Sequence, residues 1–566
     1  MSTTRIREFR FVSLVFGVLF AFAIAGCDGD DGLDGQDGLD GADGAAGADG
    51  IACWDLNGNG VEDPEEDLNG DGVVDVLDCN ALASGAYSPE QLHKGWFTER
   101  EYKGTQSCLA CHAMEGMDML TKAHFKWEGV ATNMVGEGIQ DLIHGKNDII
   151  NNFCVAVPSN EGRCTQCHAG YGYDDNTYDF GDVTNVDCLV CHDQTGSYAD
   201  GDKIYSKAPT TAGRPPEGTD LNAVARSVAT PRPPNRTAVP TIDNCIFCHA
   251  RAGGDDNVKH GDLAMSLSNT TREFDVHMGT DGANYECVEC HQVKKTLEGK
   301  LIDHGIGGMP YHSVDEGEML ACTDCHVDAA AQHAASSVAT IFESHTTLAC
   351  QVCHIPAIAR ETSTKVDWKW SDAGLDGPPE GVVTPDPVTG RETWLKKKGT
   401  FVWANNVRPT LLYHDGTWNK TIIGVNDQYT ELPAYLGGPA ADYTTEGAMI
   451  YPFKKMVGNQ PADANNNTIL VPHLFGMKGG PNPFWVDFDW NLALTDGAAY
   501  AGQTYTGEYE FVDTVMYLAV NHEIAPKEEA YGYNTPGCND CHGDGQIDWT
   551  ALGWTADPAF EGGTRP

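Results

Sequence analysis

Eight copies of the pattern Cys-x-x-Cys-His run along this chain, the first at Cys108–His112 and the last at Cys538–His542. Two thiols at this spacing can form thioether bonds with the vinyl groups of a porphyrin, and the histidine that follows can bind the iron. A zinc site would need a matching partner pair, and a redox dithiol would not need the histidine. The repeats therefore predict eight covalently bound c-type haems.

The residues predicted to hold these haems are the two cysteines and the histidine of each motif. In chain order they are Cys108, Cys111 and His112; Cys164, Cys167 and His168; Cys188, Cys191 and His192; Cys245, Cys248 and His249; Cys287, Cys290 and His291; Cys322, Cys325 and His326; Cys350, Cys353 and His354; and Cys538, Cys541 and His542.

The second axial ligand of each iron must come from outside the motifs. A low-spin electron carrier needs two strong ligands, and imidazole is a suitable second one. Twenty histidines leave twelve outside the motifs, enough for every haem. Position and local sequence favour seven of the twelve as distal ligands: His124, His260, His277, His304, His333, His345 and His522.

The first residues read as an export signal. Arg5, Arg7 and Arg10 precede an apolar run, which is shorter than the ~20 residues that a membrane helix needs. The run ends in IAGC, which resembles a bacterial lipobox with Cys27 as the lipidated residue; ordinary cleavage is the alternative. We expect residues 1–26 to be removed and the protein to lie outside the cytoplasm, periplasmic or on the cell surface, anchored to a membrane by lipid.

Residues 27–52 form an acidic segment with glycine at every third position from Gly29 to Gly50. This is the period of collagen, in which only glycine fits at the crowded axis of three chains. The segment contains no proline, so a triple helix would be weak. A flexible tether between lipid and domain and a stalk that joins copies into an oligomer or filament both remain open.

Residues 53–79 contain two adjacent stretches that fit the twelve-residue calcium loop. Oxygen-bearing side chains recur at the ligand positions, and Gly60 and Gly72 stand where the loop turns. The segment predicts one or two calcium ions, and an ordinary polar loop is the alternative. A disulfide between Cys53 and Cys79 would close the segment. The predicted ligands are Asp55, Asn57, Asn59 and Glu66 in the first loop and Asp67, Asn69, Asp71, Asp75 and Asp78 in the second.

The elements that must position the motifs fall into three further segments. Residues 93–360 carry motifs one to seven, residues 361–520 carry none, and residues 521–566 carry the eighth. The motif-free stretch is rich in Gly and Pro, which predicts irregular structure with short strands. Helices elsewhere should be short because haem contacts replace much of an apolar core, and without haem we expect the body not to fold.

The charge of the 566-residue chain excludes one class of partner. A formal net charge of -46 argues against nucleic acid, because binding phosphates requires clusters of lysine and arginine. An acidic surface favours cationic partners and metal ions instead.

Several phrases around the motifs resemble the octahaem tetrathionate reductase family. They are INNFCVAVPSNEGRCTQCHAGYGY, NVDCLVCHDQTG, NCIFCHARAGGDDNVKHGD and CQVCHIP, with FVWANNVRPTLLYHDG in the motif-free stretch. The resemblance covers the chain from about Gly95 to Asp548. Eight motifs alone would also fit the hydroxylamine oxidoreductase type, whereas pentahaem nitrite reductases carry a Cys-x-x-Cys-Lys frame that is missing here.

This resemblance implies a mainly α fold with extensive irregular loops, organised around a closely packed haem array. It also implies two histidine ligands for seven haems and a distal lysine for one catalytic haem. The matching residue is Lys146, serving the second motif, although a solvated side chain is the alternative. A lysine amine must lose its proton to bind iron, against an ordinary pKa of ~10.4, so it is more easily displaced than histidine. Cys154 nearby would be a reactive thiol or a buried small residue.

Two functions follow from these observations. The first is an exported cytochrome that takes electrons from a quinol-linked donor or a partner cytochrome and reduces a small sulfur or nitrogen oxo-species, such as tetrathionate, nitrite or hydroxylamine, at the Lys146 haem. The second is a conduit without chemistry of its own, a cell-surface polymer that passes electrons to an extracellular acceptor with two histidines on every haem. The surplus of histidines and the glycine-rich stalk favour the conduit.

Overall fold

The computed structural model describes Val73 and residues 88–198, 219–231, 240–295, 301–308, 318–476, 482–533, 538–543 and 547–566. Apart from Val73, the predicted signal peptide, glycine segment and calcium loops lie outside these residues. The fold described below belongs to the unit that runs from Ile51 to Pro566. In the described part of the chain, no helix is both long enough and apolar enough to cross a membrane.

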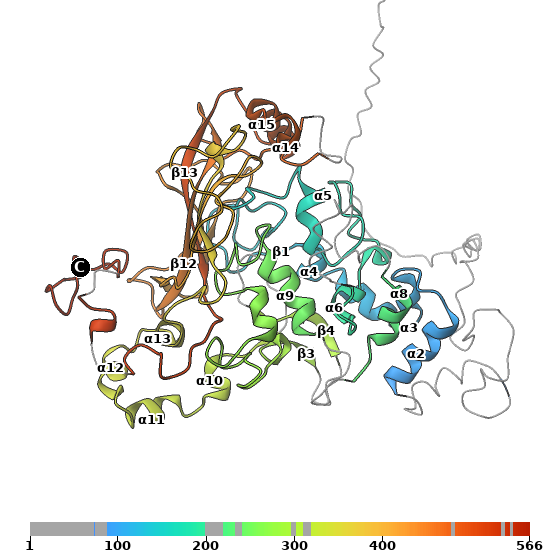
Figure 1. Cartoon of the computed structure of the whole chain (residues 1–566), viewed down its shortest axis with the longest axis horizontal. Coiled ribbons are helices and arrows are strands. Elements are labelled where there is room, and N and C mark those ends of the chain that lie inside the picture. Colours follow the sequence, from blue (N-terminus) through green and yellow to red (C-terminus); the bar gives the residue numbers. More distant parts are fainter. Residues whose placement is uncertain are drawn as a thin grey trace, which may run out of the picture. The chain divides into compact units, whose positions relative to one another are not determined.

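Short helices carry most of the motifs (Figure 1). Some of these helices begin with a cap from a nearby side chain. The Thr241 side chain accepts a hydrogen bond from the Asn244 backbone N–H at the start of α9, and the Ser88 side chain accepts one from the Gln91 backbone N–H at the start of α2. The α-helices are α2 (Pro89–Glu99), α3 (Gln106–Met119), α4 (Ala123–Lys126), α5 (Glu161–Cys164), α6 (Leu189–His192), α8 (Leu221–Ser227), α9 (Ile242–Arg251), α10 (Cys322–Cys325), α11 (Ala329–Ala334), α12 (Ala339–Ser344), α13 (Cys350–His354), α14 (Phe484–Asp487) and α15 (Trp490–Tyr500).

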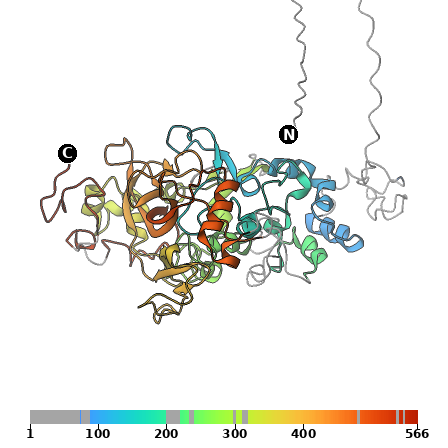
Figure 2. The same ribbon diagram turned by 90° about the horizontal axis from the view of Figure 1, so that it is seen from above.

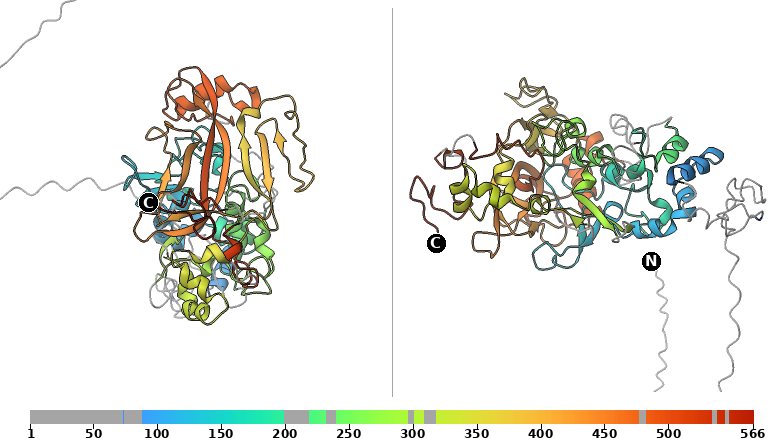
Figure 3. Two further views of the ribbon diagram at one scale, coloured as in Figure 1. Left: turned by 90° about the vertical axis from the view of Figure 1, so that its left-hand side faces the viewer. Right: turned by 90° about the horizontal axis from the view of Figure 1, so that it is seen from below.

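A large sheet fills the stretch that carries no motif. Its eight strands follow the order β10-β11-β13-β12-β6-β8-β7, with β9 paired to β12. The two longest strands, β12 and β13, run antiparallel along their whole overlap and lie side by side in Figures 1 and 3. The strands are β6 (Thr364–Lys369), β7 (Trp394–Leu395), β8 (Gly399–Ala404), β9 (Thr410–His414), β10 (Trp418–Lys420), β11 (Ala434–Pro439), β12 (Met449–Asp463) and β13 (Tyr509–Ala519).

The prediction of a mainly α fold is therefore wrong. The sheet spans most of the segment that we expected to be irregular, and its longest strand has 15 residues. The physical reason is an apolar core of its own, in which Trp368 stacks on Trp370 and Phe484 stacks on Trp490. Helices α14 and α15 cover one end of the sheet (Figures 1 and 3). This part of the chain builds a core from side chains alone.

The sheet also holds the chain segment that leads into the second motif. The Ile150 backbone donates to the Thr421 carbonyl at 2.9 Å, and the Asn152 amide donates to the Met456 carbonyl at 2.6 Å. Trp370 donates its indole N–H to the Phe153 carbonyl at 3.0 Å. Asn152 is fully buried, and these hydrogen bonds hold the segment against the large sheet.

Two smaller sheets lie outside the motif-free stretch. The first pairs β1 (Glu128–Val130) with β2 (Ile143–Gly145), and it brings the residues before Lys146 beside Trp127. The second joins β3 (His291–Lys295), β4 (Leu301–Ile306) and β5 (Glu318–Met319) in the order β4-β3-β5.

The segment 321–348 has no protein core. It contains α10, α11 and α12, and none of its side chains is buried. Val327 remains 75% exposed although it is apolar. Helices this short are unstable unless an apolar face packs against something. The sixth motif and two candidate distal histidines lie in this segment, so a bound cofactor could supply the missing contacts.

Candidate functional site

Within the part of the chain that the structure describes, six motif histidines each face a second histidine at nearly the same distance. The ring centroids are 5.9 Å apart for His93–His112, 6.2 Å for His124–His249, 6.1 Å for His277–His326, 6.2 Å for His291–His522, 6.1 Å for His333–His354 and 6.1 Å for His345–His542.

This spacing fits one metal ion between each pair. Two imidazoles that bind a metal from opposite sides, with metal–nitrogen bonds of about 2 Å, hold their ring centroids about 6 Å apart. Burial also lowers the pKa of His249 to about 3, so its ring is neutral, as a metal ligand must be. The residues present therefore could hold haem iron in six places.

Five of the seven histidines that we predicted as distal ligands lie in these pairs: His124, His277, His333, His345 and His522. His304 does not share this arrangement, since its Nδ1 lies 3.0 Å from the Asp118 carboxylate. His260 is half-buried and lies near His249 and His522. The pairing residue that we did not select is His93, which precedes the first motif much as His345 precedes the seventh, and that parallel is the signal that could have found it.

Three other histidines that we left unassigned lie elsewhere. His144 Nδ1 is 2.6 Å from the Asp148 carboxylate. His414 packs among Trp418, Tyr451 and Phe453 of the large sheet. His473 is fully buried and faces Asp496.

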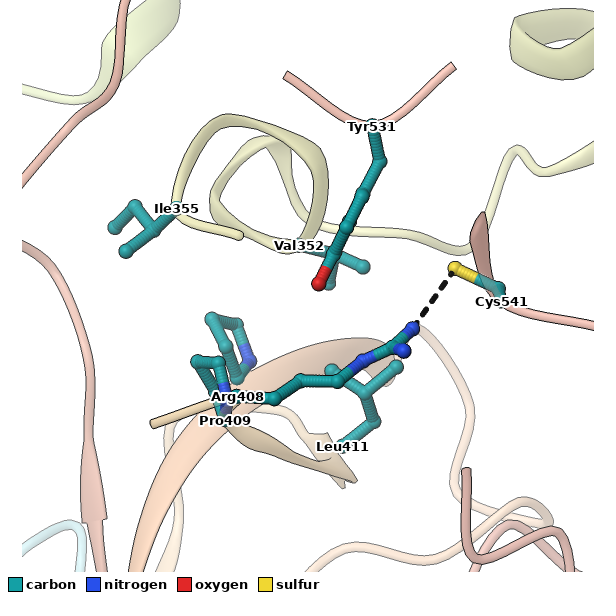
Figure 4. Close-up of a pocket in the computed structure, with 8 residues that line it drawn as sticks. Val352, Ile355, Arg408, Pro409, Leu411, Tyr531 and Cys541 are labelled. Atoms are coloured by element: carbon teal, nitrogen blue, oxygen red, sulfur yellow. Dashed lines mark hydrogen bonds between the residues drawn. The ribbon is translucent and has the colours of Figure 1, made fainter. Parts of the chain in front are cut away.

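Neighbouring motifs touch one another through their thiols. Contacts join Cys108 to Cys188, Cys167 to Cys248, Cys245 to Cys287 and Cys322 to Cys350. The seventh and eighth motifs meet at a small pocket between Val352 and Cys541, where Arg408 donates to Cys541 Sγ at 3.6 Å (Figure 4). Groups attached to these motifs would lie close together, as short-range electron transfer requires.

The series of motifs extends across the unit. The helices of the first motif, α2 and α3, and the helices around the sixth and seventh, α10 to α13, lie on opposite sides in Figures 1 and 2. A chain of redox centres on these motifs would therefore connect two separate surfaces.

His168 of the second motif has different surroundings. Within the described residues, its ring contacts are all with Phe125, Trp127, Tyr173, Tyr178 and Phe180. The ring is fully buried, and its Nε2 bonds to the Phe125 carbonyl. Burial lowers the pKa of this imidazole to about 4, so it is neutral. Its Nδ1 is buried without a hydrogen bond.

Lys146 contacts one of these rings. Its ammonium nitrogen is 4.3 Å from the centroid of the Trp127 ring, and that ring meets His168 edge-on at 5.5 Å. Its charge acts on both cysteines of the motif, Cys164 and Cys167. Lys146 and His168 therefore contact the same ring, Trp127.

Gly145 sets the position of Lys146. A Cβ atom on Gly145 would lie 2.2 Å from the Trp127 carbonyl oxygen and 2.6 Å from the Glu128 Cα, so only glycine fits between β1 and β2. Gly145→Ala should push the strands apart, displace Lys146 from Trp127 and destabilise the protein by about 1–3 kcal/mol. Thermal unfolding of the holoprotein measures this. Gly377→Ala is the control, because nothing lies within 4 Å of its Cβ position; equal melting of both variants would contradict the argument.

Further lysines are buried near this site. Burial, with the charge of Lys146 as the second cause, lowers the pKa of Lys259 to about 8. Burial likewise lowers the pKa of Lys420 to about 7, with Lys259 as the second cause. In a chain of net charge -46, this is a local concentration of positive charge. Such a region attracts anions.

Cys154 lies in the segment between Lys146 and the second motif. Its Sγ is 3.7 Å from the Gly253 carbonyl oxygen, and the charges of Lys398 and Lys365 act on it most strongly. Burial raises the pKa of this thiol, which keeps it protonated. The geometry supports a buried small residue beside the site more than a reactive thiolate.

Comparison with known proteins shows which of them this chain resembles. The solved structure of the octahaem cytochrome c from Shewanella oneidensis matches 82% of this chain and 97% of its own, with 36% sequence identity and a TM-score of 0.65. An uncharacterised protein of Archaeoglobus fulgidus is 25% identical over 232 residues, which are 34% of this chain and 73% of that protein. Residues 365–545 match the family described as bacterial cytochrome c. The likeness to the solved structure thus extends over most of both chains.

Proposed function

This chain belongs to the multihaem c-type cytochromes, and from that premise we propose that it passes electrons between eight haems and reduces a small sulfur or nitrogen oxo-species at the second motif. Covalently bound haem c and electron transfer follow from the membership. The number of haems, the residues that bind them, the lysine at the second motif and the substrate are the proposal.

The observation that carries the proposal is the contrast between His168 and the six paired motif histidines. The pairs supply two imidazoles per iron, which suits an electron carrier and leaves no open coordination position. His168 faces aromatic rings, and Lys146 contacts one of them, Trp127. We assign Lys146 as the displaceable distal ligand there, and His93, His124, His277, His333, His345 and His522 as distal ligands of the six pairs.

The buried lysines support an anionic or strongly polar substrate. A small oxo-species that entered the site would lie near Lys146, Lys259 and Lys420, whose positive charges compensate the charge of the substrate and the negative charge that develops on reduction. The lowered pKa values of Lys259 and Lys420 also make these ammonium groups able to give a proton near neutral pH. A haem at this motif would supply the electrons, and these residues would bind the substrate, orient it and deliver protons.

Spectra of the oxidised holoprotein test the proposal. Intact mass should exceed that of the processed polypeptide by eight covalent haems, and electron paramagnetic resonance should show at least one iron that differs from the low-spin bis-histidine type. Reductase activity should be found with at least one of tetrathionate, nitrite and hydroxylamine. Eight uniform bis-histidine signals without any such activity would instead favour an electron conduit.

The outer parts of the chain complete the proposal. We infer export, a lipid anchor at Cys27 and one or two calcium ions in the loops of residues 53–79, on the sequence patterns alone. Electrons would arrive from a quinol-linked donor or a partner cytochrome outside the cytoplasm. The conduit remains the second candidate, and the contacts between successive motifs support it equally.

A further inference from the structure

A buried carboxyl group lies where the first and third motifs meet. Asp187 is 2% exposed, and it directly precedes Cys188, whose thiol contacts Cys108 of the first motif. Its backbone is fixed by a bond from its N–H to the Ala169 carbonyl at 3.0 Å. No ion pair involves Asp187 among the residues that the structure describes. A carboxylate buried without a cation is costly unless it is protonated or accepts several hydrogen bonds.

Tyrosine hydroxyls surround this carboxyl group. Tyr198 donates to its two oxygens at 2.9 and 2.8 Å, and Tyr171 donates to Oδ1 at 3.1 Å. The Val190 backbone N–H is a third donor, at 3.3 Å. Burial raises the pKa of Asp187, and the hydrogen bonds from these donors offset this rise only in part. The resulting pKa is about 7.

The tyrosines continue as a chain toward solvent. The Tyr171 hydroxyl lies 3.1 Å from the Tyr102 hydroxyl, and Tyr102 lines an open pocket of about 440 Å³. Glu101, Asp220, Asn222 and Arg226 also line this pocket. Hydroxyl groups at these distances can pass a proton by exchanging donor and acceptor roles.

Asp187 is the one group in this cluster that can change charge near neutral pH. The titratable groups that interact with it are Tyr102, Tyr171, Tyr178 and Tyr198 and the motif thiols of Cys108, Cys188 and Cys191. Burial raises the pKa of each of these tyrosines, so they stay neutral. The thiols would be thioethers in the holoprotein and would not titrate.

We propose that Asp187 is a proton-binding site coupled to the haems of the first and third motifs, supplied from the pocket through Tyr102 and Tyr171. When the haem of either motif gains one electron from an external one-electron donor, which would convert iron(III) to iron(II), one proton from solvent would join the Asp187 carboxylate to give the neutral acid. The net charge of this buried region then stays constant. The proposal rests on haem at these two motifs, but not on any reductase activity.

Spectroelectrochemical titration of the full holoprotein without substrate tests this site. With a titanium(III) reductant, the potential of at least one haem should fall as pH rises from 6 to 8, by up to about 59 mV per pH unit for one proton per electron. A protonated-carboxyl band should appear on reduction in the infrared difference spectrum. Asp187→Asn keeps an acceptor for the tyrosines but should flatten the slope and remove the band.

Two further variants separate the parts of the proposal. Tyr171→Phe should keep the slope and slow proton uptake by at least tenfold, measured with an indicator dye after rapid reduction. Asp182→Asn is the control, because that carboxyl group is exposed and caps only Thr184; it should behave as the wild type. A wild-type slope and band in Asp187→Asn, or unaltered uptake in Tyr171→Phe, would overturn the proposal. If Asp187→Asn fails to fold, the wild-type band and Tyr171→Phe decide.

These results can be told apart from a failure of the proposed reductase. All of the measurements omit substrate, so the slope should persist in a protein that only conducts electrons.

Discussion

Lys146→Ala should lower reductase turnover by at least about a hundredfold, the usual scale for losing a group that assists proton transfer and binding at a reacting centre. The lysine contacts the Trp127 ring beside His168, and its removal takes away the distal amine and a positive charge together. One iron should gain a high-spin signal and bind cyanide more readily, while the other signals stay as they are. Stopped-flow reduction of the remaining haems should proceed at the wild-type rate.

Lys126→Ala is the matched control for this experiment. Lys126 lies in the same part of the chain, but its ammonium group is half-exposed and pairs with Glu128 at 3.7 Å. Its loss should change neither spectrum nor turnover by more than twofold. Wild-type spectra together with wild-type turnover in Lys146→Ala would remove the second motif as the reaction site and make the conduit the better interpretation.

Protein made without haem should keep its large sheet and lose the segment 321–348. Strands β12 and β13 are paired through eleven successive residue pairs and enclose a tryptophan-rich core. The segment 321–348 has no buried side chain, so its free energy of opening without haem should be close to zero. Hydrogen exchange of a cytoplasmic, haem-free preparation should show full exchange of this segment at the shortest labelling time and protection of Phe453–Asp463.

The holoprotein serves as the control for this measurement, since the same peptides are compared with and without cofactor. In the holoprotein, the segment that carries His333 and His345 should become protected. Protection of this segment without haem would contradict the argument, and so would exchange of the sheet at the same rate. Exchange of the sheet at the same rate would instead agree with the expectation from sequence that the whole body does not fold without haem.

The sequence predicts the redox chemistry of this chain better than its architecture. The Cys-x-x-Cys-His frame is local, so all eight sets of residues can be identified without knowing the fold. Which distal histidine faces which motif histidine depends on contacts between segments far apart in the chain, as for His291 and His522. Sequence spacing can only rank the candidate distal histidines. His93 was missed for this reason, because it sits in a separate helix before the first motif.

The sheet escaped prediction because its central strand lacks the usual signal. Strand β12 contains Pro452, Gly458 and Pro461, residues that normally argue against a strand. Most of its side chains are buried on both faces, so polar and apolar residues do not alternate. The neighbouring β13, with its β-branched and aromatic residues, carried a clearer signal, but one strand does not reveal a sheet.

The histidine pairs have a consequence for how the chain is assembled and taken apart. His291 faces His522 and His345 faces His542, so each such pair closes a very long loop of chain. In the chain-entropy model, closing a loop of 100 residues stabilises a protein by about 4.7 kcal/mol when the link is covalent. An iron bound by both histidines would act as a staple of this kind, completed only after the last motif has been exported. Acid would open these staples, because each depends on a neutral imidazole.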